Sequence, residues 1–243
     1  MIRLRLASFL DRVDSKIQRH AERLNPEPAW FREFRDYLGD PRMTIEEFWI
    51  FYAQLRKQEV PKMRAITTAA EARDFFSTSE YPLWRNLVHR RHSAWRRVLW
   101  TMNERHGEFL EFGCGIAPIS AYVRRARPKW YYWLNDIQRS PHLAFAKWRV
   151  QDSWWGENAG TADALDVMTL IDVLEHLSDP LVIAKRAVKW LRPGGYLHWN
   201  FVETDGTQLD LATAEQREAT MAYLNAELRP VYARDGYYVS RRP

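Results

Sequence analysis

The sequence predicts an α/β protein in which a doubly wound, mainly parallel sheet carries an antiparallel hairpin at its C-terminal edge and follows a helical region. From residue 107 onward, short apolar runs alternate with helical segments, which is typical of a parallel sheet covered on both faces. Near the end of the chain, two alternating strands are joined by Asp235-Gly236, a strong hairpin signal. We therefore expect a helical region over residues 1–106 and a sheet domain over residues 107–243.

The composition of the 243 residues is that of an ordinary globular protein, with 46% hydrophobic and 28% charged residues, which excludes wholesale disorder. A single Cys excludes a disulfide framework and a Cys-rich zinc site, and no residues show metal-ligand spacing, so no metal is expected. No apolar stretch approaches the length of a membrane span. We expect a cytoplasmic protein that does not enter a bilayer.

The net charge of +5 belongs to the helical region alone. Residues 1–106 carry 20 Lys and Arg against 14 Asp and Glu, whereas residues 107–243 carry 16 against 17. No long run of like charge appears, so a solvated helical surface explains this basicity better than a nucleic-acid-binding arm. The same interpretation is favoured for the basic cluster at residues 89–92, although Arg side chains can pair with an acidic substrate.

Several signals locate helices in the first 106 residues. Residues 1–24 have apolar side chains at helical spacing and predict an amphipathic helix, since two Asp within it argue against a transit peptide. Thr44 and Glu47 form a capping box that opens a helix over residues 45–57. A further helix is expected to start at Pro82 and to run to His106.

The elements of the sheet domain follow in order after Gly107. The expected strands are an apolar run at residues 108–115 that ends in glycines, residues 129–136, 164–174 and 195–201, and the hairpin 229–242. The expected helices end before Pro128, run from Ser140-Pro141 to about Arg149, run from Asp179-Pro180 to a loop at residues 192–195, and run from Thr213 to about Leu228.

The turn between the first strand and its helix is the sharpest chemical feature. It reads Glu111-Phe112-Gly113-Cys114-Gly115-Ile116-Ala117-Pro118. Two glycines let the backbone turn tightly and approach a ligand, but Pro118 stands where a dinucleotide fingerprint has its third glycine. A carboxylate at Glu111 also disfavours a pyrophosphate there. Asp136 ends the second strand, 21 residues after Gly115, where an acidic side chain binds a ribose diol in nucleotide-binding sheets.

Four motifs in this order resemble the class I S-adenosylmethionine-dependent methyltransferases, which have a Rossmann-like fold. They are the loop LEFGCGIAP, the strand-end Asp136, DVLEHLSDP at residues 172–180 and LRPGGYL at residues 191–197. The DVLEHL and RPGG segments are similar to the branch that acts on small molecules. The resemblance covers residues 107–243 and departs from the commonest loop pattern at Ala117.

This resemblance implies a cofactor site for S-adenosylmethionine. Glu111, Gly113 and Gly115 would shape the pocket for its methionine part, with Cys114 as a small residue beside it. Asp136 would bind the ribose hydroxyls, and Ile137 would pack against the adenine. The acidic residue that touches the adenine amino group is expected at Asp152, with Ser153 beside it, after a very short strand. Asp163 is the alternative.

The segment after the fourth strand is expected to face both cofactor and acceptor, because ligands bind at the carboxyl ends of parallel strands. Ile171 and Asp172 are therefore expected at the cofactor, and His176 is the candidate general base, since its unperturbed pKa lies near working pH. The alternative is that Glu175-His176 only packs beneath the sheet. His198, Asn200, Glu203 and Asp205 are polar groups that we expect on the strand and loop surface.

The sequence therefore predicts a methyltransferase that uses S-adenosylmethionine to methylate an oxygen or nitrogen of a metabolite or sugar-like small molecule. The helical region is expected to cover the pocket and supply much of the acceptor site. A nucleic-acid partner is not expected and a homodimer is possible. Two alternatives stay open: an RNA- or protein-directed methyltransferase that uses the basic helices, and a non-catalytic cofactor-binding subunit.

Overall fold

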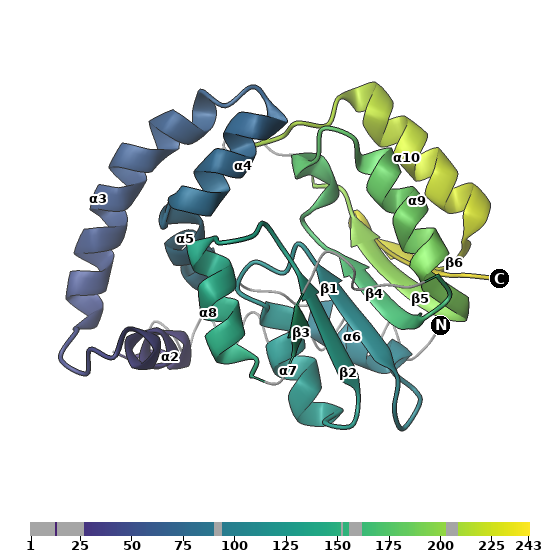
Figure 1. Ribbon diagram of the computed structural model, residues 1–243, viewed down its shortest axis with the longest axis horizontal. Helices are drawn as coiled ribbons and strands as arrows, with labels where there is room; N and C mark the ends of the chain where they lie inside the picture. Colours follow the sequence, from purple (N-terminus) through teal and green to yellow (C-terminus); the bar gives the residue numbers. More distant parts are fainter. Residues whose placement is uncertain (1–12, 14–26, 90–93, 152, 156–161, 203–208) are drawn as a thin grey trace.

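The computed structural model describes residues 13, 27–89, 94–151, 153–155, 162–202 and 209–243. A central sheet is covered by helices on both faces, and α2–α5 form an arc along one side of it (Figure 1). The helices in the described residues are α2 (Ala29–Leu38), α3 (Ile45–Arg64), α4 (Ala69–Thr78), α5 (Tyr81–His89), α6 (Ala94–Thr101), α7 (Pro118–Ala126), α8 (Pro141–Arg149), α9 (Pro180–Trp190) and α10 (Ala214–Glu227), with a 3₁₀ turn at Leu174–His176.

The seven described strands lie in the order β3-β2-β1-β4-β5-β7-β6 across the sheet. They are β1 (Glu108–Phe112), β2 (Tyr131–Asn135), β3 (Trp154–Trp155), β4 (Leu165–Leu170), β5 (Leu191–Asn200), β6 (Arg229–Arg234) and β7 (Tyr237–Arg241). The pairs from β3 to β5 are parallel, and β7 is antiparallel to both β5 and β6. The predicted parallel sheet with an antiparallel C-terminal hairpin is confirmed.

The strand order decides which helices cover which face. The chain moves from β1 outward through β2 to β3, but in the opposite direction from β4 to β5. Because parallel crossovers are right-handed, α7 and α8 lie on one face and α9 on the other. The packing agrees: Phe109 and Val167 join the core under α6 and α7, whereas their neighbours Leu110 and Met168 join the core under α9 and α10. The order reverses between β1 and β4, which is where such sheets bind ligands.

Helices α2–α5 have a core of their own that is joined to the sheet domain through α8. Aromatic rings fill this core, with Phe34 4.9 Å from Trp84 and 6.2 Å from Phe145 of α8 between ring centroids. Capping boxes begin α3 at Thr44 and α4 at Thr68. The packing against Phe145 fixes α2 relative to α8, and the ring of Phe76 in α4 lies 6.3 Å from the His142 ring of α8.

The structure corrects several predicted boundaries. Helix α3 continues past residue 57 to Arg64, because Pro61 lies only one turn before its end and Met63 is buried in the helical core. The helix predicted from Pro82 to residue 106 is two elements, since α5 packs on α3 whereas α6 packs on α7. Helix α4 was not predicted, although Thr68 and Glu71 give the same capping signal as the box before α3.

Two corrections concern β5. The loop expected at residues 192–195 lies within the strand, because Gly194, at φ +82°, donates its backbone N–H to the Arg242 carbonyl and keeps an irregular stretch in the sheet. His198 is fully buried instead of lying on the surface. Its Nε2 is 2.8 Å from Thr101 Oγ1 and its Nδ1 is 2.7 Å from the Tyr237 hydroxyl.

None of the helices in the described ranges combines the length and the apolar composition that a membrane crossing needs.

Candidate active site

A cavity of about 970 Å³ lies at the carboxyl ends of β1, β2 and β4, under helices α4 and α5. Its size is that of a small-molecule or cofactor site. The turn after β1, the strand end after β2 and the segment after β4 form its floor, and side chains of α3, α4 and α5 form the opposite wall. The cavity thus joins the sheet domain to the helical region.

The turn after β1 is held by its glycines and by Glu111. Gly113 and Gly115 have φ values of +63° and +51°, which L side chains adopt only with strain. A Cβ added to Gly113 would stand 2.5 Å from Val173 Cγ2, so glycine is required for the close packing of this turn. Glu111 Oε2 accepts hydrogen bonds from the backbone N–H of Ser120 at 2.7 Å and from its hydroxyl at 2.5 Å. The carboxylate therefore fixes the first turn of α7 to β1.

Burial raises the pKa of Glu111 to about 7, although the hydrogen bonds from Ser120 and Ile119 oppose this. Cys114 in the same turn is also buried, and burial raises the pKa of its thiol, so it is not a reactive thiolate. The expected role of Cys114 as a small residue in this turn agrees with its place in the structure.

Asp136 lines the cavity directly after β2, and its carboxylate is held by three donors. Oδ2 accepts from the Gly115 N–H at 2.5 Å, and Oδ1 accepts from the Ile137 N–H at 2.7 Å and lies 2.9 Å from His142 Nε2. Burial alone would raise the pKa of Asp136, but His142 and the backbone donors outweigh it and lower that pKa. Asp136 is therefore a carboxylate that ties the glycine turn to α8.

His142 is a site residue that the sequence reasoning missed. It lies in the first turn of α8, lines the cavity, is 4% exposed, and its Nδ1 has no hydrogen-bond partner in the described structure. The spacing of six residues from Asp136 carries no recognised signal, because a short loop and not a helical turn brings the two side chains together.

Most of the predicted site residues meet at this one cavity. Those that line it are Glu111, Gly113, Cys114, Gly115, Asp136, Ile137, Ile171, Asp172 and His176. Ser153 does not line it, because it precedes β3 and so lies toward the other end of the strand. Asp152, Glu203 and Asp205 lie outside the described residues. The short third strand follows residue 152 in the sequence instead of preceding it.

The alternative residue for the adenine contact, Asp163, lies just before the amino-terminal end of β4. It forms an ion pair with Arg242 and does not line the cavity. A carboxylate at the amino-terminal end of β4 cannot reach a ligand at the carboxyl ends of the strands. The structure therefore contradicts the suggestion that Asp163 contacts the adenine.

His176 faces the cavity with a defined tautomer. Its Nδ1 is hydrogen-bonded to the backbone carbonyl of Leu209. Because a carbonyl only accepts, Nδ1 carries the hydrogen and Nε2 of the neutral ring is left as an acceptor. Burial lowers the pKa of His176, against the opposing effects of the Leu209 carbonyl and Asp210. The ring is thus held neutral at pH 7, which is the state a general base needs.

Asp172 joins the ends of β4 and β5. Its backbone N–H donates to Asn200 Oδ1 at 2.7 Å, and its Oδ1 accepts from Asn200 Nδ2 at 2.6 Å. The residue has φ +54°, a strained conformation that typically costs about 1–3 kcal/mol and clusters at functional sites. This clamp fixes the direction in which the segment up to His176 leaves the sheet.

Besides His142 Nδ1, two buried polar groups that line the cavity have no partner in the described part of the chain, namely Glu175 Oε2 and Thr169 Oγ1. Each residue is only 1% exposed. Burial raises the pKa of Glu175 to about 8, and Asp172 and Asp210 add to this, so the group is neutral at pH 7. The sequence motif contained Glu175, but its burial depends on contacts that the motif does not show.

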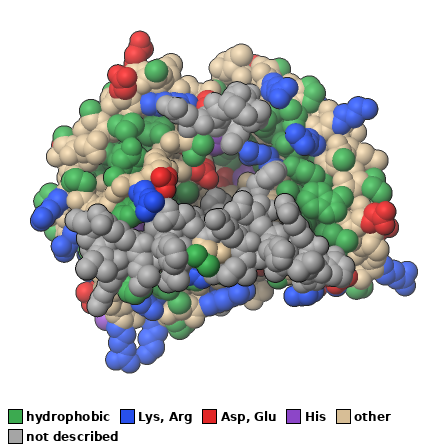
Figure 2. All heavy atoms as spheres, turned by 180° about the vertical axis from the view of Figure 1, so that it is seen from behind, with side chains coloured by type: hydrophobic (Ala, Val, Ile, Leu, Met, Phe, Trp, Pro, Cys, Tyr) green, Lys and Arg blue, Asp and Glu red, His purple; other side chains and the backbone are tan. Residues whose placement is uncertain are grey.

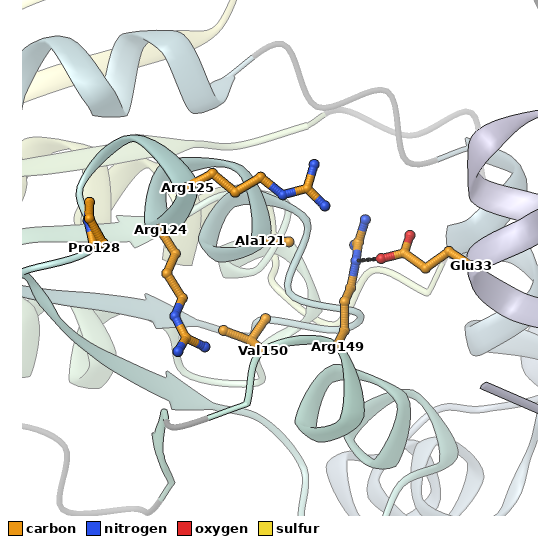
Figure 3. A pocket seen from close by; sticks show the side chains of 7 residues that line it. All are labelled: Glu33, Ala121, Arg124, Arg125, Pro128, Arg149 and Val150. Atoms are coloured by element: carbon orange, nitrogen blue, oxygen red, sulfur yellow. Dashed lines mark hydrogen bonds and ion pairs between the residues drawn. The ribbon is translucent and has the colours of Figure 1, made fainter. Parts of the chain in front are cut away.

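A second, smaller cavity of about 260 Å³ lies between α2 and the C-terminal ends of α7 and α8 (Figure 3). Arg149 points toward Glu33 there, with Nε 2.7 Å from Oε1, and its Nη1 donates to the Ile116 carbonyl at 3.1 Å. Arg149 therefore anchors α2 to the glycine turn. None of the predicted site residues lines this cavity.

The parallel sheet, the glycine turn and the acidic residue after β2 together define a class I methyltransferase-like α/β protein. A model of the methyltransferase domain family matches residues 84–234, well over half of the chain. The chain belongs to this family, and the predicted class I S-adenosylmethionine-dependent methyltransferase is confirmed. A comparison with curated protein sequences found no match.

Solved structures support the same fold. Magnesium protoporphyrin IX methyltransferase from Synechocystis, with bound S-adenosylmethionine, is 14% identical over 74% of this chain and 99% of that one, with a TM-score of 0.52. The pyocyanin biosynthetic protein PhzM is 12% identical over 70% of this chain and 61% of that one, with a TM-score of 0.51. Haemonchus contortus phosphoethanolamine N-methyltransferase 2 is 15% identical over 68% of this chain and 45% of that one, with a TM-score of 0.50.

Proposed function

We propose that this methyltransferase transfers the methyl group of S-adenosylmethionine to an oxygen or nitrogen atom of a small-molecule acceptor. The proposal rests mainly on one observation. Asp136, held at the glycine turn, and the unprotonated Nε2 of His176 belong to residues that line the same cavity. The solved structures described above add support, since two of the three are named for small-molecule methylation.

The residues around Asp136 fit a ribose. A carboxylate has about four positions for accepting hydrogen bonds. Three donors occupy positions on Asp136, two at Oδ1 and one at Oδ2, so one position at Oδ2 is left for a hydroxyl. With its Nε2 hydrogen directed at Asp136, His142 offers its buried Nδ1 as a further acceptor. The two side chains thus supply acceptors for a diol.

When bound, S-adenosylmethionine would supply a methyl group whose bond to sulfur breaks as the acceptor atom bonds to the carbon, with S-adenosylhomocysteine as the leaving group. Much of the rate of such a reaction comes from holding the two reactants in near-attack geometry. The Glu111 contacts to α7 and the Asp136 contacts to the glycine turn keep the cofactor half of the cavity rigid. Helices α4 and α5 lie over the cavity and, in this proposal, limit the access of water to it.

His176 is proposed to take the proton that an acceptor hydroxyl or ammonium loses. Its Nε2 is unprotonated, because Nδ1 donates to Leu209, and the side chain keeps 25% of its surface exposed. General base catalysis by a positioned His contributes about 10²–10⁴-fold. A base is needed only if the acceptor must lose a proton, so the size of this effect reports on the acceptor.

The helical region is proposed to supply most of the acceptor site. Met63 of α3, Phe76 of α4 and Tyr81 of α5 line the cavity opposite the segment after β4. An apolar wall of this kind suits the body of an organic acceptor.

Titration calorimetry with S-adenosylmethionine tests this proposal. Asp136→Ala is expected to weaken binding by about 100-fold, because the variant loses an acceptor and leaves the Gly115 N–H and His142 without their partner. Asp74→Ala, on the exposed part of α4 away from the cavity, is the matched control. Equal affinities for the two variants would contradict the assignment of Asp136, and transfer of label to RNA or protein instead of metabolites would contradict the acceptor class.

A further inference from the structure

The charged groups of the cavity are unevenly partnered. The acidic ones are either bonded inside the protein, as at Glu111, Asp136 and Asp172, or neutral, as at Glu175. The basic ones, Arg73, Arg85 and Arg139, make neither an ion pair nor a hydrogen bond in the described ranges. Within the described residues, the cavity therefore holds three cationic side chains that no internal ion pair neutralises.

Arg85 is the innermost of these three arginines. It is half-buried on α5, whereas Arg73 and Arg139 are exposed. Arg85 lines the same cavity as His176 and Leu209, so its guanidinium belongs to the wall that α5 presents to the segment after β4. A desolvated cation without a counter-ion is costly, and a bound anion would remove that cost.

The cavity that Arg85 lines also has apolar walls. Phe76, Leu177, Leu209 and Leu211 contribute to them. From behind, the molecule is hollowed near its centre, and acidic, basic and histidine side chains meet there between larger hydrophobic areas (Figure 2). Such a site suits a ligand with an apolar body and a single anionic group.

We propose that the methyl acceptor carries a carboxylate or phosphate group and that Arg85 binds this group, with Arg73 at the rim. The planar guanidinium binds either anion through two parallel hydrogen bonds, which orients the acceptor as well as holding it. With the anion at Arg85, the body of the acceptor extends toward Nε2 of His176. This inference rests on the proposed function, because it names the class of acceptor for that site.

The carboxylate of the cofactor is the other anion that could meet Arg85. Asn86, the next residue on α5, lies closer to the glycine turn, since a Cβ added to Gly115 would stand 3.2 Å from Asn86 Nδ2. No atom of Arg85 lies within 4 Å of that added Cβ, although Arg85 lines the cavity together with His176. The geometry therefore assigns Asn86 to the cofactor side and Arg85 to the acceptor side.

A labelled-methyl assay on the full chain tests the assignment. A metabolite extract of the source cells is separated by anion exchange into retained and unretained fractions, and each is incubated with the protein and S-adenosylmethionine carrying a labelled methyl group. Label is expected in the retained fraction. If prior phosphatase treatment of that fraction abolishes labelling, the anion is a phosphate; if labelling persists, it is a carboxylate.

Three variants complete the experiment. Arg85→Ala is expected to lower kcat/KM for the labelled fraction about 100-fold, as for loss of one partner of a desolvated charge pair. Arg85→Lys should recover part of this loss, and Arg64→Ala, at the exposed end of α3, should behave as wild type. Calorimetry with S-adenosylmethionine should give the same Kd for all three, which also shows that the variants are folded.

The outcomes separate the two proposals. Absence of cofactor binding and of methyl transfer by the wild-type protein would overturn the proposed function. Two results would overturn only the proposal that the acceptor is anionic, provided that the cofactor binds. One is label in the unretained fraction alone, and the other is an Arg85→Ala variant as active as wild type. A loss of cofactor affinity above tenfold in Arg85→Ala would move Arg85 to the cofactor carboxylate.

Discussion

The two halves of the cavity differ in how far their polar groups are satisfied by the protein itself. Around the glycine turn, Glu111 and Asp136 each accept several hydrogen bonds, and these bonds tie the turn to α7 and α8. Under α4 and α5, Arg85 has no ion pair in the described structure, and Glu175 Oε2 has no hydrogen bond. The carboxylates of the half that we assign to the cofactor are thus held by the protein itself, with His142 Nδ1 as the exception. The half that we assign to the acceptor leaves Arg85 and Glu175 Oε2 without a partner among the described residues.

This difference has an energetic meaning. Groups that are already fixed lose little conformational entropy on binding, which favours tight and specific binding of one cofactor. Unpaired buried groups cost stability in the free protein, and a ligand that pairs them recovers that cost. An acceptor that lacks the matching groups would leave them unpaired, so the same arrangement provides specificity.

The largest expected effect breaks the rigid half. Gly113→Ala would place a Cβ 2.5 Å from Val173 Cγ2 at a φ of +63°, so the turn must shift. Backbone strain and overpacking together cost about 3 kcal/mol or more, and S-adenosylmethionine affinity should fall at least about 100-fold. Gly39→Ala is the matched control, because Gly39 has φ +66° but nothing within 4 Å of the added Cβ. Calorimetry that finds normal affinity for Gly113→Ala would show that the turn is not held as the structure indicates.

A second variant tests the acceptor half without touching the cofactor. His176→Gln should lower kcat by about 10²-fold while leaving the Kd for S-adenosylmethionine unchanged, because the variant removes only a proton acceptor. Steady-state kinetics gives kcat and calorimetry gives Kd for His176→Gln and for the control His106→Gln, which alters an exposed residue before β1. A kcat within threefold of wild type would show that the acceptor loses no proton to this side chain.

The unsatisfied half is also expected to make stability depend on pH. The folded pKa of Glu175 is about 8 against an ordinary value of 4.5, so the folded state keeps a proton that the unfolded state has released. Stability should therefore fall as pH rises from about 4.5 to 8, by up to about 1.4 kcal/mol per pH unit from this group.

Glu175→Gln imitates the neutral acid and should remove the part of this dependence that comes from Glu175, while Glu111, whose pKa is raised to about 7, keeps its own part. Denaturant unfolding at pH 5 and pH 8 gives the free energies, with Glu218→Gln on the exposed face of α10 as control. Wild type and Glu175→Gln should be similar at pH 5, and the variant should be the more stable at pH 8. Parallel curves for the two proteins would mean that Glu175 is ionised in the folded state.

The same contrast explains what the sequence predicted well. Asp136 and the glycine turn are local features, since a strand end or a turn demands particular residues within a few positions. His142, Arg85 and the buried His198 were missed or misplaced, because their roles depend on residues that only the fold brings near. His198 shows this clearly: it alternates as a strand residue should, but Thr101 and Tyr237, 97 and 39 residues away, decide that it is buried. His198 stays neutral because burial, together with the charge of Arg97, lowers its pKa to about 3.

The smallest expected effect comes from destabilising helix α4, which lines the acceptor half of the cavity. Thr68 begins α4 with a capping box in which its Oγ1 accepts from the Glu71 N–H at 3.2 Å. Thr68→Ala should destabilise the protein by about 1 kcal/mol, and Thr68→Ser, which keeps the hydroxyl, should cost less. Because α4 carries Arg73 and Phe76, the KM for the acceptor should rise in Thr68→Ala while the Kd for S-adenosylmethionine stays the same. If the KM for the acceptor and the Kd for S-adenosylmethionine both rose, the two halves of the cavity would be coupled. A disturbance of α4 would then reach the glycine turn through the hydrogen bonds that Asp136 makes with Gly115 and His142.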